Sequence, residues 1–122
     1  MIPQAIAQPK ISLPAPTGVP CPMLQFVDLV AGKWAIPVLY RLIVISDPIR
    51  FGELQRGVRP ITQKELTRQL RAFERKGLVR RTQFAEIPPR VEYQVTELGR
   101  SLHAPLQSLA QWVMDHQECL GA

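Results

Sequence analysis

The chain has 122 residues, of which 46% are hydrophobic and 20% charged, and this is the size and composition of one globular domain. Fifteen Lys and Arg against ten Asp and Glu give a net charge of +5, a surplus that points toward a polyanionic partner. Two cysteines exclude a disulfide-rich secreted scaffold. The N-terminus lacks the pattern of a signal peptide, and prolines interrupt the uncharged run over residues 11–27, so we expect a cytoplasmic protein without a membrane span.

Residues 1–20 contain a single charge, Lys10, together with five prolines. Proline lacks the backbone N–H and fixes φ, so helix and central strand are both disfavoured there. We expect an extended or mobile arm over residues 1–20, followed by one domain over residues 21–122. The arm either packs on the domain or is a tail without function, and the sequence leaves both open.

Helical signals begin after this arm. A short helix is predicted from Pro22 with Cys21 at its N-cap, because proline is favoured at the first helical position. A second helix is predicted from about Trp34, with Pro37 in its first turn, where N–H groups have no partner within the helix. The run over residues 38–45 is apolar almost all round, which predicts a helix at the centre of the core.

A pair of helices is predicted next. The first covers Phe51 to about Gly57, and the second begins at a capping box formed by Thr62 and Glu65. The second helix runs to about Lys76, before a glycine that suits the position after a helix end. A short helix, a tight break and a second helix with polar and basic residues at its start predict a helix-turn-helix.

A β-hairpin is predicted to follow, with strands over residues 78–84 and 91–96. The loop between them contains Pro88-Pro89 and ends at Arg90, whose guanidinium would suit the negative minor groove of DNA. The expected fold is mainly α with a small β-wing, that is, a winged helix-turn-helix with terminal dimerisation helices.

One face of the predicted second helix carries charge of a single sign. At ~100° per residue, Lys64, Arg68, Arg71 and Arg75 fall within an arc of roughly 60°, opposite the apolar side chains. A merely solvated helix face normally mixes positive and negative residues for mutual support. The repeated positive charge therefore predicts contact with phosphate. The residues expected to meet DNA are Arg50, Gln63, Lys64, Thr67, Arg68, Arg71, Arg75 and Arg90.

The last predicted helical stretch covers residues 97–120, and Pro105 must either kink it or start a second helix. Apolar residues recur along it at helical spacing and need cover. We expect a second copy of the chain to supply that cover, and packing within the same domain is the alternative. The expected interface residues are Leu98, Leu102, Leu106, Leu109, Trp112 and Val113.

Short sequence pieces over about residues 21–113, in order and without a large gap, resemble the HxlR-type winged-helix transcriptional regulators. The pieces are Cys21-Pro22, Gly32-Lys33-Trp34, Arg50-Phe51-Gly52-Glu53-Leu54, Ile61-Thr62-Gln63-Lys64-Glu65-Leu66-Thr67, Leu70-Arg71, Gly77-Leu78-Val79, Pro88-Pro89-Arg90-Val91-Glu92-Tyr93 and Thr96-Glu97-Leu98-Gly99-Arg100. The resemblance implies a prokaryotic homodimer, joined through its first and last helices, that binds a pseudo-palindromic operator and most often represses transcription. Such a dimer would place two recognition helices about one DNA turn apart, ~34 Å.

The resemblance also implies that Cys21 senses oxidants or electrophiles. A thiol at a helix N-terminus is favoured as the reactive thiolate. A Cys21–Cys119 disulfide between subunits is conceivable, while a buried, inert Cys21 is the opposing interpretation. Two alternative hypotheses for the function remain. One is control by a small apolar ligand at the dimer interface, and the other is a winged helix used for protein–protein contact.

No enzyme, cofactor or metal site is expected from the sequence. It contains no nucleophile motif and no glycine-rich phosphate loop. Asp115, His116 and Cys119 offer metal-ligand types, but two histidines and two cysteines in the whole chain make a dedicated site improbable.

Overall fold

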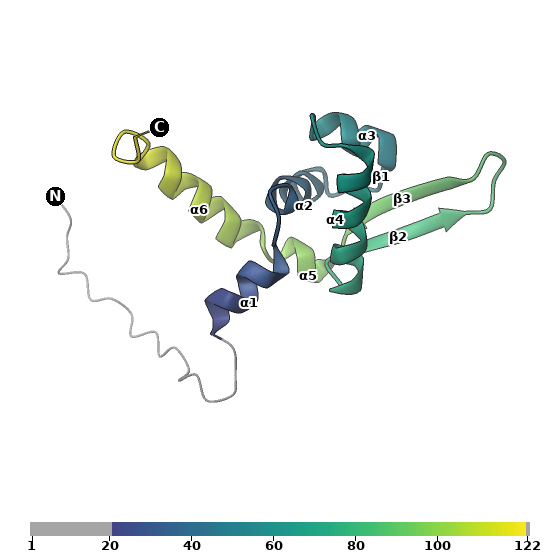
Figure 1. Cartoon of the computed structure of the whole chain (residues 1–122). Helices are drawn as coiled ribbons and strands as arrows, with labels where there is room; N and C mark the ends of the chain where they lie inside the picture. Colours follow the sequence, from purple (N-terminus) through teal and green to yellow (C-terminus); the bar gives the residue numbers. More distant parts are fainter. Residues whose placement is uncertain (1–20, 122) are drawn as a thin grey trace. The chain divides into compact units, whose positions relative to one another are not determined.

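The computed structural model describes residues 21–121 (Figure 1). These residues belong to two compact units that divide between Ala31 and Gly32, and each unit is described by itself. The arm expected over residues 1–20 lies outside the described residues. Across residues 21–121, every helix is too short or too polar to cross a bilayer.

The first unit contributes helix α1, Pro22–Leu29. Cys21 occupies the N-cap position and Pro22 the first turn, as predicted, although the Cys21 side chain makes no capping hydrogen bond. No residue of α1 is buried, and Met23, Leu24 and Val27 are all more than half exposed.

The second unit begins with helix α2, Ala35–Ile45, for which Trp34 is the N-cap. Pro37 lies in its first turn, as predicted. The helix was expected at the centre of the core, and one of its sides is buried there, but Val44 is 56% exposed and Ile36 is 37% exposed, so it is not covered all round. Ala35, Val38, Leu39, Leu42 and Ile43 form the side that faces the core.

The predicted helix-turn-helix is present as α3, Phe51–Gly57, and α4, Gln63–Arg75. Buried apolar side chains and one hydrogen bond stabilise the turn between the helices. Val58 and Ile61 are buried in it, and Nε2 of Gln55 donates a hydrogen bond to the Ile61 carbonyl over 3.2 Å. The buried side chains of the two helices are Leu54, Leu66, Leu70 and Phe73. The inner face of α4 is thereby fixed to the core, and its outer face stays free.

Three antiparallel strands form the sheet in the order β1-β3-β2. They are β1, Ile49–Arg50, β2, Val79–Phe84, and β3, Arg90–Val95. The β2–β3 hairpin is the predicted wing, and Figure 1 shows it extending beyond α4. The sequence did not predict β1, whose Ile49 pairs with Tyr93. The expected architecture, mainly α with a small β-wing, is confirmed.

The C-terminal helical stretch is divided into α5, Glu97–Arg100, and α6, His103–Asp115. Thr96 caps α5, since its Oγ1 accepts a hydrogen bond from the Gly99 N–H over 3.1 Å. Pro105 lies in the first turn of α6, where the missing N–H costs no helical bond. Of the two alternatives for Pro105, the structure has the second helix, and this helix ends at Asp115, with turns rather than α-helix over residues 116–121.

Candidate nucleic-acid interface

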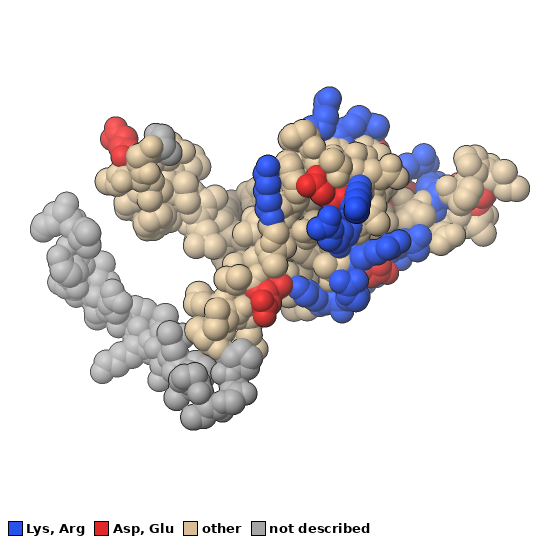
Figure 2. Space-filling model, in the orientation of Figure 1, with Lys and Arg blue, Asp and Glu red and all other residues tan. Residues whose placement is uncertain are grey.

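The outer face of α4 carries the basic residues that the sequence placed there. Lys64, Arg68, Arg71 and Arg75 are all exposed. Figure 2 shows lysine and arginine side chains gathered on the face of the second unit that carries α4. This side of the helix therefore presents positive charge to solvent.

A shallow depression of about 770 Å³ runs along this face. It is lined by Thr62, Gln63, Lys64, Thr67, Arg68, Arg71 and Arg75. The structure thus brings together six of the eight residues expected to meet DNA, all from one helix. Arginine and lysine can donate to guanine edges or to phosphate, and glutamine can pair with adenine.

The first turn of α4 is closed by a reciprocal pair of hydrogen bonds. Oε1 of Glu65 accepts from the Thr62 backbone N–H over 2.9 Å, and Oγ1 of Thr62 accepts from the Glu65 N–H over 3.1 Å. The hydrogen bond from the Thr62 backbone lowers the pKa of Glu65 most, followed by that from its hydroxyl, with the Trp34 indole and the charge of Lys33 adding to the shift. The predicted capping box is confirmed, and it fixes where the basic face begins.

Arg50 and Arg90 lie apart from that face, around a second hollow of about 410 Å³ between the start of α3 and the wing tip. Arg50 is exposed, and its backbone N–H donates to Oε1 of Glu53 over 3.5 Å. The guanidinium of Arg50 only donates, so it cannot complete a capping box, and it remains available to an outside acceptor.

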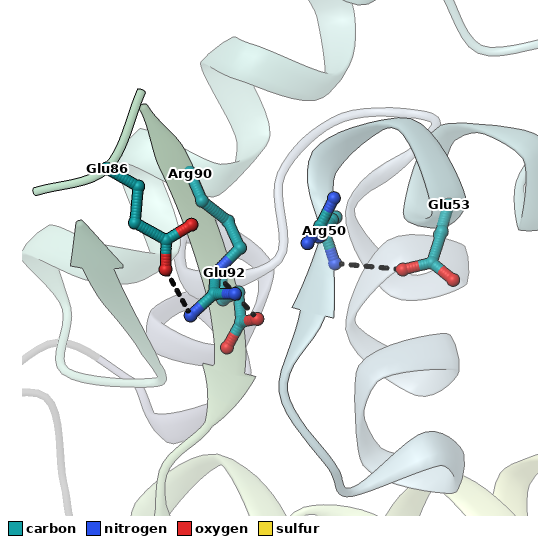
Figure 3. Close-up of polar contacts among 5 residues, drawn as sticks. All are labelled: Arg50, Glu53, Glu86, Arg90 and Glu92. Carbon is teal, nitrogen blue, oxygen red and sulfur yellow. Dashed lines mark hydrogen bonds and ion pairs between the residues drawn. The ribbon is translucent and has the colours of Figure 1, made fainter. Parts of the chain in front are cut away.

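Arg90 is held by its own wing (Figure 3). Its Nη2 lies 3.2 Å from Oε2 of Glu86, and its Nε lies 3.4 Å from Oε2 of Glu92. The guanidinium also lies over the Phe84 ring, 4.1 Å from its centre. The Nε atom is buried and the Glu92 contact lacks hydrogen-bond geometry, so it is an ion pair only. Arg90 is thus a partly enclosed side chain, and the exposed apex of the wing is Ile87.

A third hollow, of about 310 Å³, lies between α4 and the wing, where sequence reasoning named no site. Its lining residues are Thr67, Arg71, Glu74, Arg81 and Tyr93. Arg81 lies on β2 opposite Tyr93 and adds a second basic group next to Arg71. The sequence shows Arg81 as a strand residue but contains no local signal for how the hairpin packs beside α4.

The residues expected at a dimer interface divide into two groups. Leu106 is only 4% exposed and packs within its own chain, where α6 contacts α2. Leu102 is partly buried. Four others are exposed, namely Leu98, Leu109, Trp112 and Val113. Trp112 stacks on His116 with ring centres 4.6 Å apart and still leaves half of its surface open.

Both cysteines are free thiols, with Cys21 partly buried and Cys119 exposed. Across the described range, no three His, Cys, Asp or Glu side chains gather as metal ligands would.

The chain is similar in sequence to several curated regulators. It is 47% identical over 85 residues to the HTH-type transcriptional regulator YkvN of Bacillus subtilis, covering 70% of each chain. It is 40% identical over 104 residues to an HTH-type transcriptional regulator of Methanothermobacter thermautotrophicus, covering 83% of this chain and 78% of the relative.

Two similar solved structures are the reduced forms of transcriptional or redox regulators. The redox regulator HypR in its reduced form superposes with a TM-score of 0.74 at 35% identity, covering 82% of this chain and 97% of that one. The reduced form of the transcriptional regulator YodB from B. subtilis gives 0.69 at 30% identity, covering 85% and 99%.

The model of the HxlR-like helix-turn-helix family matches residues 29–119, the greater part of the chain. This match covers α2 to α6, including the helix-turn-helix and the wing. The chain therefore belongs to the HxlR-like helix-turn-helix family and is a transcriptional regulator rather than an enzyme.

Proposed function

We propose that the chain is a homodimeric, sequence-specific DNA-binding protein that acts in the cytoplasm as a repressor. The observation that carries this proposal is the one-sign basic face of α4, exposed over its whole length, on the second helix of a helix-turn-helix. In this motif the second helix enters the major groove with its N-terminal residues toward the base edges. Gln63, Lys64 and Thr67 then meet bases or nearby phosphates, and the basic residues farther along hold the backbone.

The two residues outside α4 that are expected to contact DNA, Arg50 and Arg90, differ in how available their guanidinium groups are. Exposed Arg50, at the start of α3, is a phosphate contact in this proposal. Arg90 is the less available of the two, because its guanidinium already pairs with Glu86 and Glu92 and lies over the Phe84 ring, so a phosphate has to compete with these contacts.

The dimer is proposed from the apolar surface on the helices near the two ends of the described chain. On α1, Met23, Leu24 and Val27 are exposed, and on α6, Leu109 and Trp112 are about half exposed. Apolar surface of this extent needs a partner in water. A second copy of the chain provides an equal surface, and a two-fold axis would place two α4 helices on successive major grooves.

Thiol chemistry is the proposed input. Cys21 stands at the N-cap of α1, next to the apolar surface assigned to the dimer, and Cys119 is exposed near the chain end. The similarity to HypR and YodB supports a redox role, since HypR is named a redox regulator and YodB was also solved after diamide treatment. Oxidation at the dimer interface would change the spacing of the two α4 helices and hence the affinity for DNA.

Selection of duplexes from a random pool by the full chain tests this proposal. The expected result is enrichment of a pseudo-palindrome with half-sites one helical turn apart, bound by a dimer in light scattering. Failure to enrich any sequence, or binding by a monomer, would contradict it.

A further inference from the structure

The turn Gly32–Trp34, which precedes α2, contacts one side of α4 at two points. Nε1 of Trp34 donates a hydrogen bond to Oε2 of Glu65 over 3.2 Å. At Gly32, where φ is +107°, a Cβ would lie 2.7 Å from Nε2 of Gln69, so the backbone there lies against the Gln69 side chain. Glu65 and Gln69 are one helical turn apart and share a side of α4. The turn therefore lies along the first half of this helix.

The two carboxylate oxygens of Glu65 accept hydrogen bonds from two different parts of the chain. Oε1 accepts from the Thr62 N–H and begins the helix, whereas Oε2 accepts from the Trp34 indole and connects the helix to the turn. Lys33 lies beside this pair, with Nζ 5.0 Å from the centre of the Trp34 ring. A carboxylate can accept at both oxygens, and an amide at only one. The chemistry of residue 65 therefore decides whether both connections exist together.

The position of this contact along α4 gives it a consequence for DNA recognition. Gln63, Lys64, Thr67 and Arg68 surround Glu65 in sequence and line the basic depression. The buried side chains of α4 fix how closely the helix packs on the core. A rotation or tilt of its first turn would still move these four side chains relative to the base edges in the major groove of DNA. Recognition groups need placement within about 0.5 Å, which calls for a supporting contact next to them.

We propose that Trp34 is a positioning residue for DNA recognition: its hydrogen bond to Glu65 holds the first turn of α4 at the orientation in which its side chains meet the base edges. This inference rests on the proposed role of α4 as the DNA-reading helix. Trp34 itself lies outside the depression and touches no DNA in this proposal.

The test measures affinity for a duplex selected by the wild-type chain. Trp34→Phe keeps an aromatic ring and removes the donor. Glu65→Gln keeps one oxygen for the Thr62 N–H and places an amide group against the indole, so the cap stays and the link to Trp34 is lost. We expect each variant to bind the duplex about three- to tenfold more weakly, as the loss of one hydrogen bond suggests. The double variant should bind no more weakly than the weaker single variant, because both changes remove the same bond.

Whether Glu65→Gln weakens or tightens DNA binding separates a positioning role of Glu65 from an effect of its negative charge. Removing a carboxylate from a DNA-facing helix should by itself tighten binding. Glu118→Gln makes the same change in charge at an exposed position outside α4 without touching Trp34, and we expect it to bind as tightly as wild type or more tightly. The indole ¹H–¹⁵N resonance of Trp34 reports whether the bond exists, and it should move with protonation of Glu65 in wild type and lose that pH dependence in Glu65→Gln.

The folded fraction of each variant is measured by circular dichroism at the binding temperature, and Glu65→Gln alone suffices if Trp34→Phe unfolds. Wild-type affinity in both single variants, with the indole resonance displaced in Glu65→Gln, would overturn the role of Trp34. Additive losses in the double variant would overturn it as well. Failure of the wild type to enrich any duplex is a separate result, which contradicts DNA reading by α4 itself.

Discussion

Arg90 and Glu86 form an ion pair across the base of the wing loop, with Nη2 of the arginine 3.2 Å from Oε2 of the glutamate. Phe84 covers the guanidinium from one side, so only 27% of the Arg90 side chain is exposed. The arginine at the wing is therefore already paired and partly covered before any DNA is bound. Glu86 competes with phosphate for it, and the wing's contribution to DNA binding depends on that competition.

Replacing Glu86 with Gln removes one of the two carboxylates that pair with Arg90 and should tighten binding to a duplex of arbitrary sequence by up to about fivefold, which is the range of an exposed ion pair. Glu118→Gln removes the same charge far along the chain from the wing and serves as the control for net charge. Fluorescence anisotropy at one salt concentration measures both. An equal gain in the two variants would show that the ion pair does not restrain Arg90.

The packing of α5 against the rest of the second unit depends on the absence of a side chain at Gly99. A Cβ there would collide with the Leu78 carbonyl oxygen and would lie 2.6 Å from Cγ2 of Val95. Gly99→Ala should destabilise the fold by about 1–3 kcal/mol, the usual cost of overpacking. Gly52→Ala, whose Cβ would meet only the Arg56 guanidinium at 3.6 Å, should change stability little.

Urea denaturation of the two glycine variants measures the difference directly. A midpoint for Gly99→Ala equal to that of Gly52→Ala would contradict the close approach of Gly99 to Leu78.

The charge on Glu65 links the stability of the fold to pH. Hydrogen bonds from Thr62 and Trp34 lower the pKa of this carboxyl in the folded chain from its ordinary value of 4.5. A lowered folded pKa means stabilisation that is fully present above pH 4.5 and is lost as the pH falls through the folded pKa. Wild type should thus exceed Glu65→Gln in stability at neutral pH, and the gap should shrink at acid pH. Chemical denaturation at several pH values measures it, and a gap independent of pH would contradict this origin.

Much of this fold follows from local rules and could be predicted from the sequence. Thr62 and Glu65 mark the start of α4 because their capping bonds join residues three apart. Gly77 marks its end, since its φ of +77° is a backbone conformation that glycine adopts most readily. The basic face of α4 was equally predictable, because helical periodicity alone places the four basic residues together.

What the sequence could not predict depends on contacts between distant residues. Strand β1 is two residues long and exists because Ile49 and Arg50 pair with β3, and such a short segment has no periodicity of its own. The hydrogen bond between Trp34 and Glu65 joins the turn before α2 to the first turn of α4, 31 residues further along the chain. Leu106 belongs to the same apolar stripe as Leu109, and only the structure shows that the first packs on its own chain.

Thiol oxidation should change DNA affinity through Cys21. The expected result is altered binding of the wild type after a mild thiol oxidant and unaltered binding of Cys21→Ser. Cys119→Ser separates two versions of the proposal, because a Cys21–Cys119 disulfide between subunits requires both thiols, and for that version a non-reducing gel should show a cross-linked dimer in wild type only. If wild type and Cys21→Ser bind equally before and after oxidant, the redox input is contradicted.

The central claim is that the basic face of α4 binds the DNA backbone and bases, and its most direct test is the salt dependence of binding. Arg68→Gln and Arg100→Gln remove the same charge from two exposed positions, the first on α4 and the second on α5. For a phosphate contact the slope of log Kobs against log salt should fall by about 0.9. We predict this loss for Arg68→Gln, with weaker binding, and a wild-type slope for Arg100→Gln. Equal slopes and affinities in wild type and both variants would contradict the account.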